Sequence, residues 1–179
     1  MTPLKRALDI VTAAAGLILL APVLLVIAVL VAVSSPGPAL FRQERVGKDE
    51  RIFICNKFRT MHLGTRQRAT HEISPSAVTQ VGSFLRAHKL DELPQLWNVL
   101  AGEMSLVGPR PCLPNQQQLI AERRKRNVFS VRPGITGLAQ VQGVDMSDPV
   151  RLAEIDQTYV RTRSLGMDLR LIVKTIFRS

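Results

Sequence analysis

A long stretch without charge near the N-terminus is the feature that most constrains the fold. No charged side chain occurs from residue 10 to residue 41, and the 24 residues from Ile10 to Val33 are apolar enough to enter a bilayer. At about 1.5 Å per residue, a straight helix over this segment would reach about 36 Å, more than the roughly 30 Å of a hydrocarbon layer. A single spanning helix is therefore the simplest interpretation. A cleaved signal peptide is disfavoured, because its apolar region is usually roughly 7–15 residues.

Two features of this segment favour a bend instead. Pro22 lies near its midpoint, where it removes a backbone donor and kinks or breaks a helix. Basic residues flank both ends, and the positive-inside tendency draws both ends to the same side of a membrane. These residues are Lys5, Arg6, Arg42, Arg45, Lys48 and Arg51. A re-entrant helix that bends at Ala21 and Pro22 satisfies both features, and a tilted, kinked span is the alternative that the sequence leaves open.

The charge balance points to an anionic partner. The chain has 24 Lys and Arg against 14 Asp and Glu, a formal net charge of +10, which suits nucleic acid, lipid headgroups or a phosphorylated substrate. Aromatic residues make up only 4%, too few for the stacking surface of a single-strand binder, so nucleic acid is disfavoured. The basic run at 123–126 favours a solvated helix face over lipid or nucleotide contact. Cys55 and Cys112 lie in no metal-binding or disulfide pattern.

After the apolar segment, the patterns are those of a mixed, helix-rich domain. Residues 35–38 (SPGP) end the helix and turn the chain. A β-prone run at 51–57 (RIFICNK) follows a turn at 47–49, which predicts a short strand pair. Residues 62–76 predict an exposed loop. An amphipathic C-terminal helix, packed on the domain or lying in a membrane interface, is predicted from Leu169, Ile172, Val173 and Ile176.

Two acids, Asp91 and Glu92, stand side by side in this basic chain. The structural interpretation is a helix that begins near Asp91, because acids favour a first turn and Pro94 is tolerated there. Gly102 would close this helix. The apolar residues at helical spacing, which predict one buried face, are Leu93, Leu96, Trp97 and Leu100. On spacing alone, the structural interpretation is favoured.

The functional interpretation uses the same two residues. A carboxylate that attacks phosphorus can form an acyl-phosphate and split one phosphoryl transfer into two steps. Cations must then hold the other phosphate oxygens, and Arg86 and Arg110 are candidates. A magnesium ion bound by a carboxylate and the substrate phosphates would fit, because this ion rarely needs a full protein cage.

Six blocks of sequence, taken together, decide between these interpretations. They are KRALDIV (5–11), SPGPALFRQERVG (35–47), KFRTM (57–61), VGSFLR (81–86), LDELPQLWNVLAGEMSLVGPRP (90–111) and RPGITGLAQVQG (132–143). In these blocks the chain resembles the monotopic phosphoglycosyl transferases, the bacterial sugar transferase family, almost from end to end and as the minimal catalytic unit. The resemblance implies transfer of a sugar 1-phosphate from a UDP-sugar to polyprenyl (undecaprenyl) phosphate, with release of UMP.

The resemblance also implies roles for the acidic pair. Asp91 matches the nucleophile that attacks the β-phosphate and carries the phosphosugar as a covalent intermediate. Glu92 matches the second acid, which orients Asp91 or magnesium, or assists the acceptor. Asp91 is also the expected contact to Mg²⁺, shared with the substrate phosphates.

Further residues are implied to bind the donor. Arg86 and Arg110 match arginines that hold phosphate. Lys57, Arg59 and the RPGITG block match positions near the nucleotide, and the residues taken from that block are Thr136 and Gly137.

The implied architecture is an α-rich α+β monotopic membrane protein. Residues 1–34 would form the re-entrant membrane helix, and residues 35–179 an integrated catalytic domain with a small β-hairpin and interfacial amphipathic helices. Its site would lie on the cytoplasmic face of the bacterial inner membrane. One departure stands out: small members of the family commonly have Ser-Pro at the break, where serine can bond a carbonyl freed by proline, and this chain has Ala21 and Pro22.

The expected partners follow from this activity: a UDP-sugar, polyprenyl phosphate, membrane lipids and downstream glycosyltransferases, but not nucleic acid. Two other classes compete, a membrane-anchored phosphohydrolase and a non-catalytic basic adaptor for anionic lipid. Dependence on the lipid acceptor separates the first from a transferase, and substitution of Asp91 separates the second. The motifs do not identify the sugar or the glycoconjugate pathway.

Overall fold

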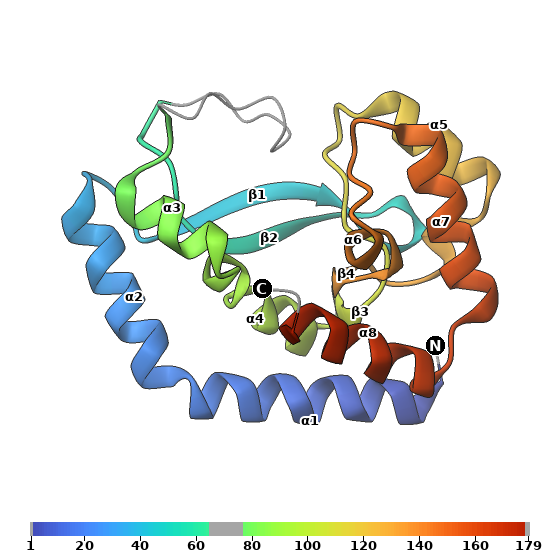
Figure 1. Ribbon diagram of the computed structural model, residues 1–179, viewed down its shortest axis with the longest axis horizontal. Coiled ribbons are helices and arrows are strands. Elements are labelled where there is room, and N and C mark those ends of the chain that lie inside the picture. The colour runs from blue at the N-terminus through green and yellow to red at the C-terminus, as the bar shows by residue number, and fades with distance from the viewer. Residues whose placement is uncertain (1, 65–76, 178–179) are drawn as a thin grey trace.

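The structure, a computed structural model, describes residues 2–64 and 77–177. It is helix-rich with a small antiparallel hairpin, as the sequence predicts, and helices lie at both ends of that hairpin and along one side of it (Figure 1). A second pair of short strands, β3 and β4, runs parallel and was not expected from the sequence. The loop predicted over residues 62–76 lies mostly outside the described residues.

The two N-terminal helices form a bent pair. Helix α1 (Pro3–Leu19) and helix α2 (Ala21–Ser34) meet at Leu20 with a bend of 63°. Pro22 has no N–H to donate to the carbonyl one turn earlier, so the helix breaks where the sequence predicts, with Ala21 beside it. Among the described helices, none is by itself both long and apolar enough to cross a membrane, whereas this pair meets the criterion when taken together.

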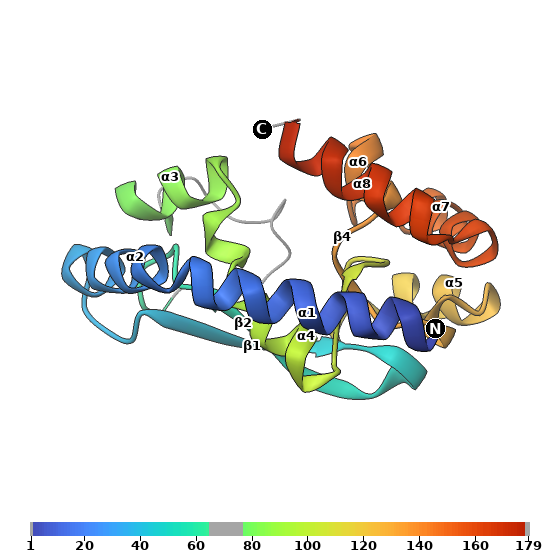
Figure 2. The same ribbon diagram turned by 90° about the horizontal axis from the view of Figure 1, so that it is seen from below.

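Each helix of the pair packs on one side only. Ala13 of α1 is buried beside Leu96 and Val99, while Ile27 and Val31 of α2 pack against Phe58 and other residues of the domain. Figure 2 shows α1 running past α4 and β3. The opposite side is apolar and exposed, and its large side chains are Leu4, Leu8, Ile10, Val11, Ile18, Leu19, Val23, Leu25, Val26, Val29, Leu30 and Val33.

The hairpin forms from the segment that the sequence predicts. Strand β1 (Leu40–Val46) pairs antiparallel with β2 (Ile52–Phe58), with Leu40 opposite Phe58 and Val46 opposite Ile52. The connection contains a 3₁₀ turn, η1 (Lys48–Glu50), in which Asp49 and Glu50 have positive φ. This pairing fixes which side chains of the two strands share a face.

The rest of the chain adds short helices around the hairpin. They are α3 (Gln80–Ala87), the 3₁₀ turn η4 (Leu90–Glu92), α4 (Gln95–Ala101), α5 (Gln117–Lys125), the 3₁₀ turn η5 (Val128–Ser130), α6 (Leu138–Gln142), α7 (Pro149–Thr162) and α8 (Leu165–Phe177). Strand β3 (Ser105–Val107) follows α4 and pairs with β4 (Gly134–Thr136). The loop after β3 packs closely on β4: a Cβ on Gly134 would lie 2.1 Å from the backbone nitrogen of Gly108.

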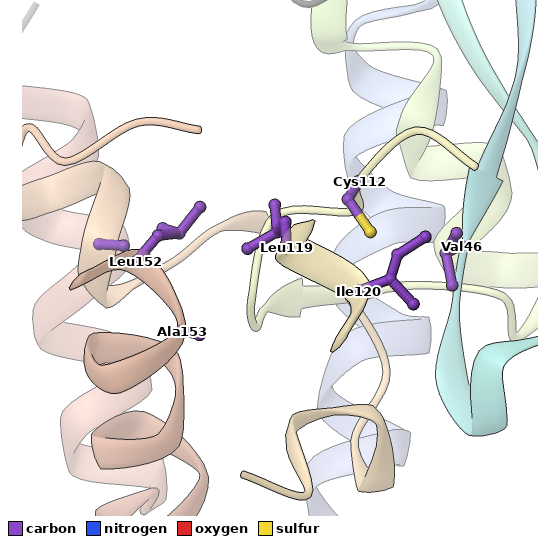
Figure 3. Close-up of a cluster of buried hydrophobic side chains, with 7 residues drawn as sticks. Val46, Cys112, Leu119, Ile120, Leu152 and Ala153 are labelled. Atoms are coloured by element: carbon purple, nitrogen blue, oxygen red, sulfur yellow. The ribbon is translucent and has the colours of Figure 1, made fainter. Parts of the chain in front are cut away.

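A buried apolar cluster joins the end of the hairpin to the C-terminal helices (Figure 3). Val46 at the end of β1 packs with Cys112, Leu119 and Ile120, and helix α7 contributes Leu152 and Ala153, with Ala139 of α6 completing the cluster. Neither cysteine of the chain forms a disulfide, and both are buried. The cluster holds the loop that precedes α5 against the hairpin.

Buried polar groups tie α1 to the second half of the domain. Asp9, 1% exposed, accepts hydrogen bonds from Ser105 Oγ at 2.8 Å and from the backbone N–H of Leu106 at 3.3 Å. Lys5 forms ion pairs with Asp9 at 2.8 Å and with Asp168 of α8 at 3.0 Å. The apolar N-terminal helix is therefore bonded into the domain at specific points.

One sequence prediction about a helix face needs correction. Helix α4 begins at Gln95, after the 3₁₀ turn that holds the acidic pair, and Gly102 closes it at φ 85° as predicted. Trp97 is not on its buried face: the residue is 63% exposed, and Gln95 and Asn98 are buried instead. The buried face shifts because α4 lies between α1 and the edge of β2, and that edge requires polar partners.

At the C-terminus, α8 confirms the predicted helix, but most of the predicted stripe is exposed. Leu169, Val173 and Ile176 are exposed, whereas Leu171 is the apolar residue that becomes buried, beside Val107. The helix therefore has an apolar face that the domain does not cover.

Asn98 supplies the polar partners that the edge of β2 requires. Its amide Nδ2 donates to Ile54 O and to Glu103 Oε2, both at 2.6 Å, and its Oδ1 accepts from the backbone N–H of Asn56 at 3.0 Å. The side chain is 1% exposed, so these bonds are made without competition from water.

We expect Asn98→Ala to lower the free energy of unfolding by about 2–3 kcal/mol, because the buried Ile54 carbonyl and Asn56 N–H would lose their partner. Thermal unfolding of the purified protein measures this. The control is Trp97→Ala, at the preceding and exposed position, which should change the free energy of unfolding by less than about 0.5 kcal/mol. Equal melting temperatures for wild type and Asn98→Ala would contradict this account.

Candidate functional site

The hairpin presents polar side chains on one face. Because side chains alternate along a strand, Phe41, Gln43 and Arg45 of β1 share a face, and the register places Lys57 of β2 opposite Phe41. All four line a cavity of about 1170 Å³ that also receives the acidic pair.

The acidic pair lies on a tight turn. Lys89 adopts a left-handed conformation (φ 56°) after α3 and starts the 3₁₀ turn that contains Asp91 and Glu92. Contacts to α3 and β2 hold this turn beside the hairpin. Two adjacent residues of such a turn project in different directions, which gives the two carboxylates different surroundings.

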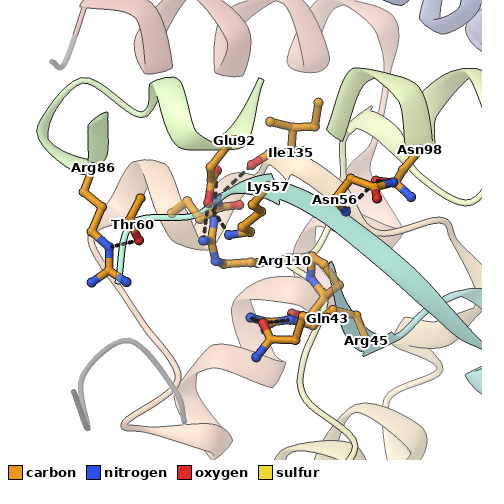
Figure 4. A network of polar contacts seen from close by, with 12 residues as sticks. Gln43, Arg45, Asn56, Lys57, Thr60, Arg86, Glu92, Asn98, Arg110 and Ile135 are labelled. Carbon is orange, nitrogen blue, oxygen red and sulfur yellow. Dashed lines mark hydrogen bonds and ion pairs between the residues drawn. The ribbon is translucent and has the colours of Figure 1, made fainter. Parts of the chain in front are cut away.

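Glu92 is fully paired (Figure 4). Its Oε1 lies 2.8 Å from Lys57 Nζ and also accepts a hydrogen bond from Arg110, whose Nη1 donates to Oε2 at 3.3 Å. Burial alone would raise the pKa of Glu92, but the charges and hydrogen bonds of Arg110 and Lys57 outweigh it and hold the pKa well below its usual range. Glu92 is therefore an anion at neutral pH that fixes two cations.

Asp91 is in the opposite situation. Within the part of the chain that the structure describes, its carboxylate makes no hydrogen bond and no ion pair. Burial and the neighbouring charge of Glu92 raise the pKa of Asp91, while Lys57, Arg110 and Arg86 act against that rise. Asp91 is thus an unpaired carboxylate facing three cations, which is the condition of a reactive oxygen nucleophile.

The loop at 108–112 places Arg110 through its backbone. Arg110 O accepts a hydrogen bond from Arg123 Nη1, and Pro111 O accepts one from Arg45 Nη1, each at 2.9 Å. Gly134 N donates to Pro109 O at 3.0 Å. Several elements therefore fix this loop, and the Arg110 side chain reaches Glu92 from a rigid base.

The other predicted phosphate ligand, Arg86, comes from α3. Its Nε donates to Thr60 Oγ1 at 2.9 Å (Figure 4), and within the described residues its two terminal amino groups make no hydrogen bond to protein. Arg86 lines the same cavity as Asp91 and Arg110, so the fold brings the two arginines together.

Arg59 has a different set of partners from the rest of the site. Its guanidinium donates to four backbone carbonyls at the end of α2, those of Val31, Ser35, Pro36 and Gly37. These carbonyls include orphan acceptors of the helix terminus, so Arg59 caps α2. The residue borders the cavity, but its two terminal nitrogens are directed at this cap, and its Nε is buried without a hydrogen-bond partner.

Thr136 and Gly137 lie where β4 meets α6. Thr136 borders the cavity, and its Oγ1 lies 2.6 Å from Thr175 Oγ1 of α8. Gly137 packs on the loop after β3: a Cβ there would lie 2.3 Å from Gly108 O. Thr136 is thus at the site, and Gly137 supports it from behind.

The cavity as a whole suits an anion. Its cationic lining residues are Arg45, Lys57, Arg59, Arg86, Lys89, Arg110 and Lys174. Its acidic lining residues are Asp91, Glu92 and Asp145. Among the described residues, no group of three or more His, Cys, Asp and Glu side chains could hold a metal ion.

Sequence reasoning missed four polar residues of this region. Gln43 and Arg45 could have been found from strand alternation combined with the hairpin register. Thr60 and Arg123 had no signal, because each acts through a contact distant in sequence. Arg123, read as part of a solvated run, is 1% exposed and pairs with Asp156 at 2.7 Å.

Comparison with known families agrees with this geometry. A family model described as "Bacterial sugar transferase" matches residues 1–179. The chain belongs to the bacterial sugar transferase family. Asp91, Glu92, Arg86 and Arg110, quoted above for the resemblance, are the residues that the fold brings together around one cavity.

Individual members of the family are similar over nearly the whole chain. A "UDP-glucose:undecaprenyl-phosphate glucose-1-phosphate transferase" of Escherichia coli (strain K12) is 42% identical over 98% of this chain, which spans 40% of that protein. One of the same description from Caulobacter vibrioides is 43% identical over 96% of this chain and 68% of its own length. A "UDP-N-acetylgalactosamine-undecaprenyl-phosphate N-acetylgalactosaminephosphotransferase" of Aeromonas hydrophila is 39% identical over 97% of this chain and 43% of its own length.

The two carboxylates should respond oppositely to neutralisation. Asp91→Asn should raise the melting temperature at pH 7, because a raised pKa means that the folded state disfavours the charge, and this gain should vanish below the unfolded pKa of 3.8. Glu92→Gln should lower the melting temperature at pH 7, because Lys57 and Arg110 lose their counter-charge. That loss should shrink as pH falls below 4.5, where the unfolded chain binds a proton and the folded one does not.

Melting curves at several pH values measure both effects. The two variants control for each other, since each replaces one carboxylate of the same turn by its neutral isostere. Shifts of the same sign would contradict the different surroundings assigned to Asp91 and Glu92.

Proposed function

We propose that the chain is a phosphoglycosyl transferase that moves a sugar 1-phosphate from a UDP-sugar to a polyprenyl phosphate and releases UMP. The observation that carries this proposal is the unpaired Asp91 carboxylate, facing Lys57, Arg86 and Arg110 in an anion-binding cavity while Glu92 takes the ion pairs. The names of the Escherichia coli and Aeromonas hydrophila relatives support the donor and acceptor classes.

The reaction would proceed in two displacements. An oxygen of Asp91 attacks the β-phosphorus of the donor, the bond from that phosphorus to the bridging oxygen breaks, and UMP leaves with the bonding electron pair. The sugar phosphate is then held on Asp91 as an acyl-phosphate. An oxygen of the lipid phosphate attacks the same phosphorus and frees the Asp91 carboxylate.

The surrounding cations would supply electrostatic stabilisation. Arg86 keeps two amino groups for the oxygens of the transferred phosphate, and Lys57 and Arg110 flank the same position from the hairpin and from the loop at 108–112. Glu92 positions Lys57 and Arg110 rather than reacting itself. Because Glu92 is paired in advance, these cations need not reorganise when charge develops.

Magnesium fits this site as a companion of the donor. Of the acidic pair, only Asp91 is unpaired among the described residues, and the cations around it repel a free metal ion. A Mg²⁺ ion arriving on the diphosphate would contact Asp91 and keep the substrate oxygens as its other ligands. Bound in this way, it would neutralise part of the diphosphate charge.

The membrane attachment is also part of the proposal. Helices α1 and α2 have an uncovered apolar side, and α8 adds exposed Leu169, Val173, Ile176 and Phe177. The bend of 63° suits a re-entrant helix whose two ends face the cytoplasm of a bacterial inner membrane. A site at that surface would meet a soluble donor and a lipid phosphate at headgroup level, and hand the product to glycosyltransferases acting next.

Intact mass spectrometry tests the covalent step. Wild type incubated with Mg²⁺ and UDP-glucose, UDP-N-acetylgalactosamine or related donors, without lipid, should gain the mass of one phosphosugar. Asp91→Asn should show no adduct and lose turnover by at least about a thousandfold, because an amide cannot displace UMP. EDTA added before the donor should prevent formation of the adduct.

Acceptor dependence separates the competing functions. Addition of undecaprenyl phosphate should remove the adduct and yield lipid-linked product, whereas release of free sugar phosphate without lipid would identify a phosphohydrolase. Normal turnover by Asp91→Asn would overturn the assigned nucleophile. Membrane binding without any turnover would leave a lipid-binding adaptor.

Cysteine labelling tests the topology. Cys55 and Cys112 are buried, so cysteines introduced at Thr2 and Ser34 should report alone. In right-side-out and inverted vesicles, both positions should be labelled from the cytoplasmic side if the helix is re-entrant. Labelling from opposite sides would favour the tilted, kinked span.

A further inference from the structure

Arg45 is a buried cation without a carboxylate partner. Its side chain points from β1 toward the cavity, and the residue is only 9% exposed. Among the described residues, its hydrogen-bond partners are neutral: Gln43 Oε1 and Pro111 O. The nearest acid that acts on its charge is Glu92, which is already paired with Lys57 and Arg110. Burying a charge in this way is unfavourable unless an anion compensates it.

The bonds of Arg45 also leave donors for a ligand. Nε and Nη2 both donate to Gln43 Oε1, at 3.1 and 2.6 Å, and Nη1 donates to Pro111 O at 2.9 Å. A guanidinium carries five N–H groups, so one on each terminal nitrogen is left over. The Gln43 amide nitrogen has no bond within the described part of the chain, and both residues line the cavity. Figure 4 shows this pair beside Arg110.

Arg45 is charged at neutral pH and lies further along the hairpin than Lys57, because the register places Lys57 opposite Phe41, four residues before Arg45 on β1. Burial and the neighbouring Arg110 lower the pKa of Arg45 to about 10, which leaves it protonated. The cations that act on Asp91 are Lys57, Arg110 and Arg86, whereas Arg45 interacts with Arg110 and Glu92. In a diphosphate aligned for attack, the phosphate next to the reacting one occupies this more distant position.

We propose that Arg45, held by Gln43, binds the α-phosphate of the donor and stabilises UMP as it leaves. This inference rests on the proposed transferase function. When the bond to the β-phosphorus breaks, the bridging oxygen stays with UMP, and the α-phosphate gains one negative charge beside Arg45. A cation at that point binds the leaving group more strongly in the transition state than in the bound donor.

Gln43→Glu tests this without removing the guanidinium. Glutamate is nearly the same size, keeps the oxygen that Arg45 contacts and supplies the carboxylate that Arg45 lacks. The bond to Pro111 O, and with it the support of the loop at 108–112, would remain. A purely structural role of Arg45 therefore predicts only the modest loss of UMP affinity that an added charge in the cavity causes through space, whereas loss of a direct phosphate contact predicts a much larger one.

The measurement is isothermal titration with UMP and with uridine, for wild type, Gln43→Glu and the neutral control Gln43→Met. We expect Gln43→Glu to bind UMP at least about tenfold more weakly than wild type, with uridine binding unchanged and the melting temperature not lowered, because the new carboxylate pairs with a buried cation. Gln43→Met should lose less UMP affinity than Gln43→Glu, because Arg45 keeps its free charge.

Three results would overturn the inference: wild-type UMP affinity in Gln43→Glu, an equal loss of UMP and uridine binding, or no UMP binding by wild type. Lipid-dependent turnover of wild type, assayed in parallel, separates this from the proposed function. If wild type shows turnover and Gln43→Glu keeps the wild-type affinity for UMP, only the role of Arg45 is rejected. Weakened UMP binding without turnover would support the phosphate contact and reject the transferase.

Discussion

The ion cluster around Glu92 is the interaction on which the rest of the site depends. Glu92 joins three separate parts of the chain, because its two partners come from β2 and from the loop after β3. Removing one partner of such a buried ion cluster lowers the free energy of unfolding, because it leaves a buried charge unpaired. Asp91 lies beside the same cations but forms no ion pair among the described residues, and its pKa is raised mainly by burial. The two adjacent acids thus differ in their surroundings: Glu92 is paired, and Asp91, the proposed nucleophile, is not paired with any described residue.

The N-terminal helix pair faces a second constraint, the unpaired carbonyls at its end. An apolar helix that ends at Ser34 leaves carbonyls without partners, which is costly wherever water is scarce. Arg59, at the end of β2, donates to these carbonyls and so connects the apolar pair to the hairpin that carries Lys57. At the other end, Asp9 and Lys5 connect α1 to β3 and α8. The apolar segment and the site therefore share one framework.

Much of the fold could be predicted from local patterns. The bend near Pro22, the hairpin and the left-handed Gly102 each follow from residues close together in sequence. The buried face of α4 could not, because the edge of β2 selects Asn98 over Trp97. The parallel pairing of β3 with β4 was missed as well, since three-residue strands carry little periodic signal and their pairing spans a long interval of chain.

The sequence by itself determined which residues were candidates for the site, namely the acidic pair and its arginines. It also determined where the apolar N-terminal helix bends, at the proline near its centre. These follow from residue chemistry and from motifs in a fixed order. Only the tertiary structure decided how the two acids differ, because pairing of Glu92 with Lys57 and Arg110 depends on contacts across 35 and 18 positions of sequence. The same holds for Arg45, whose lack of a carboxylate partner is a property of its surroundings in space.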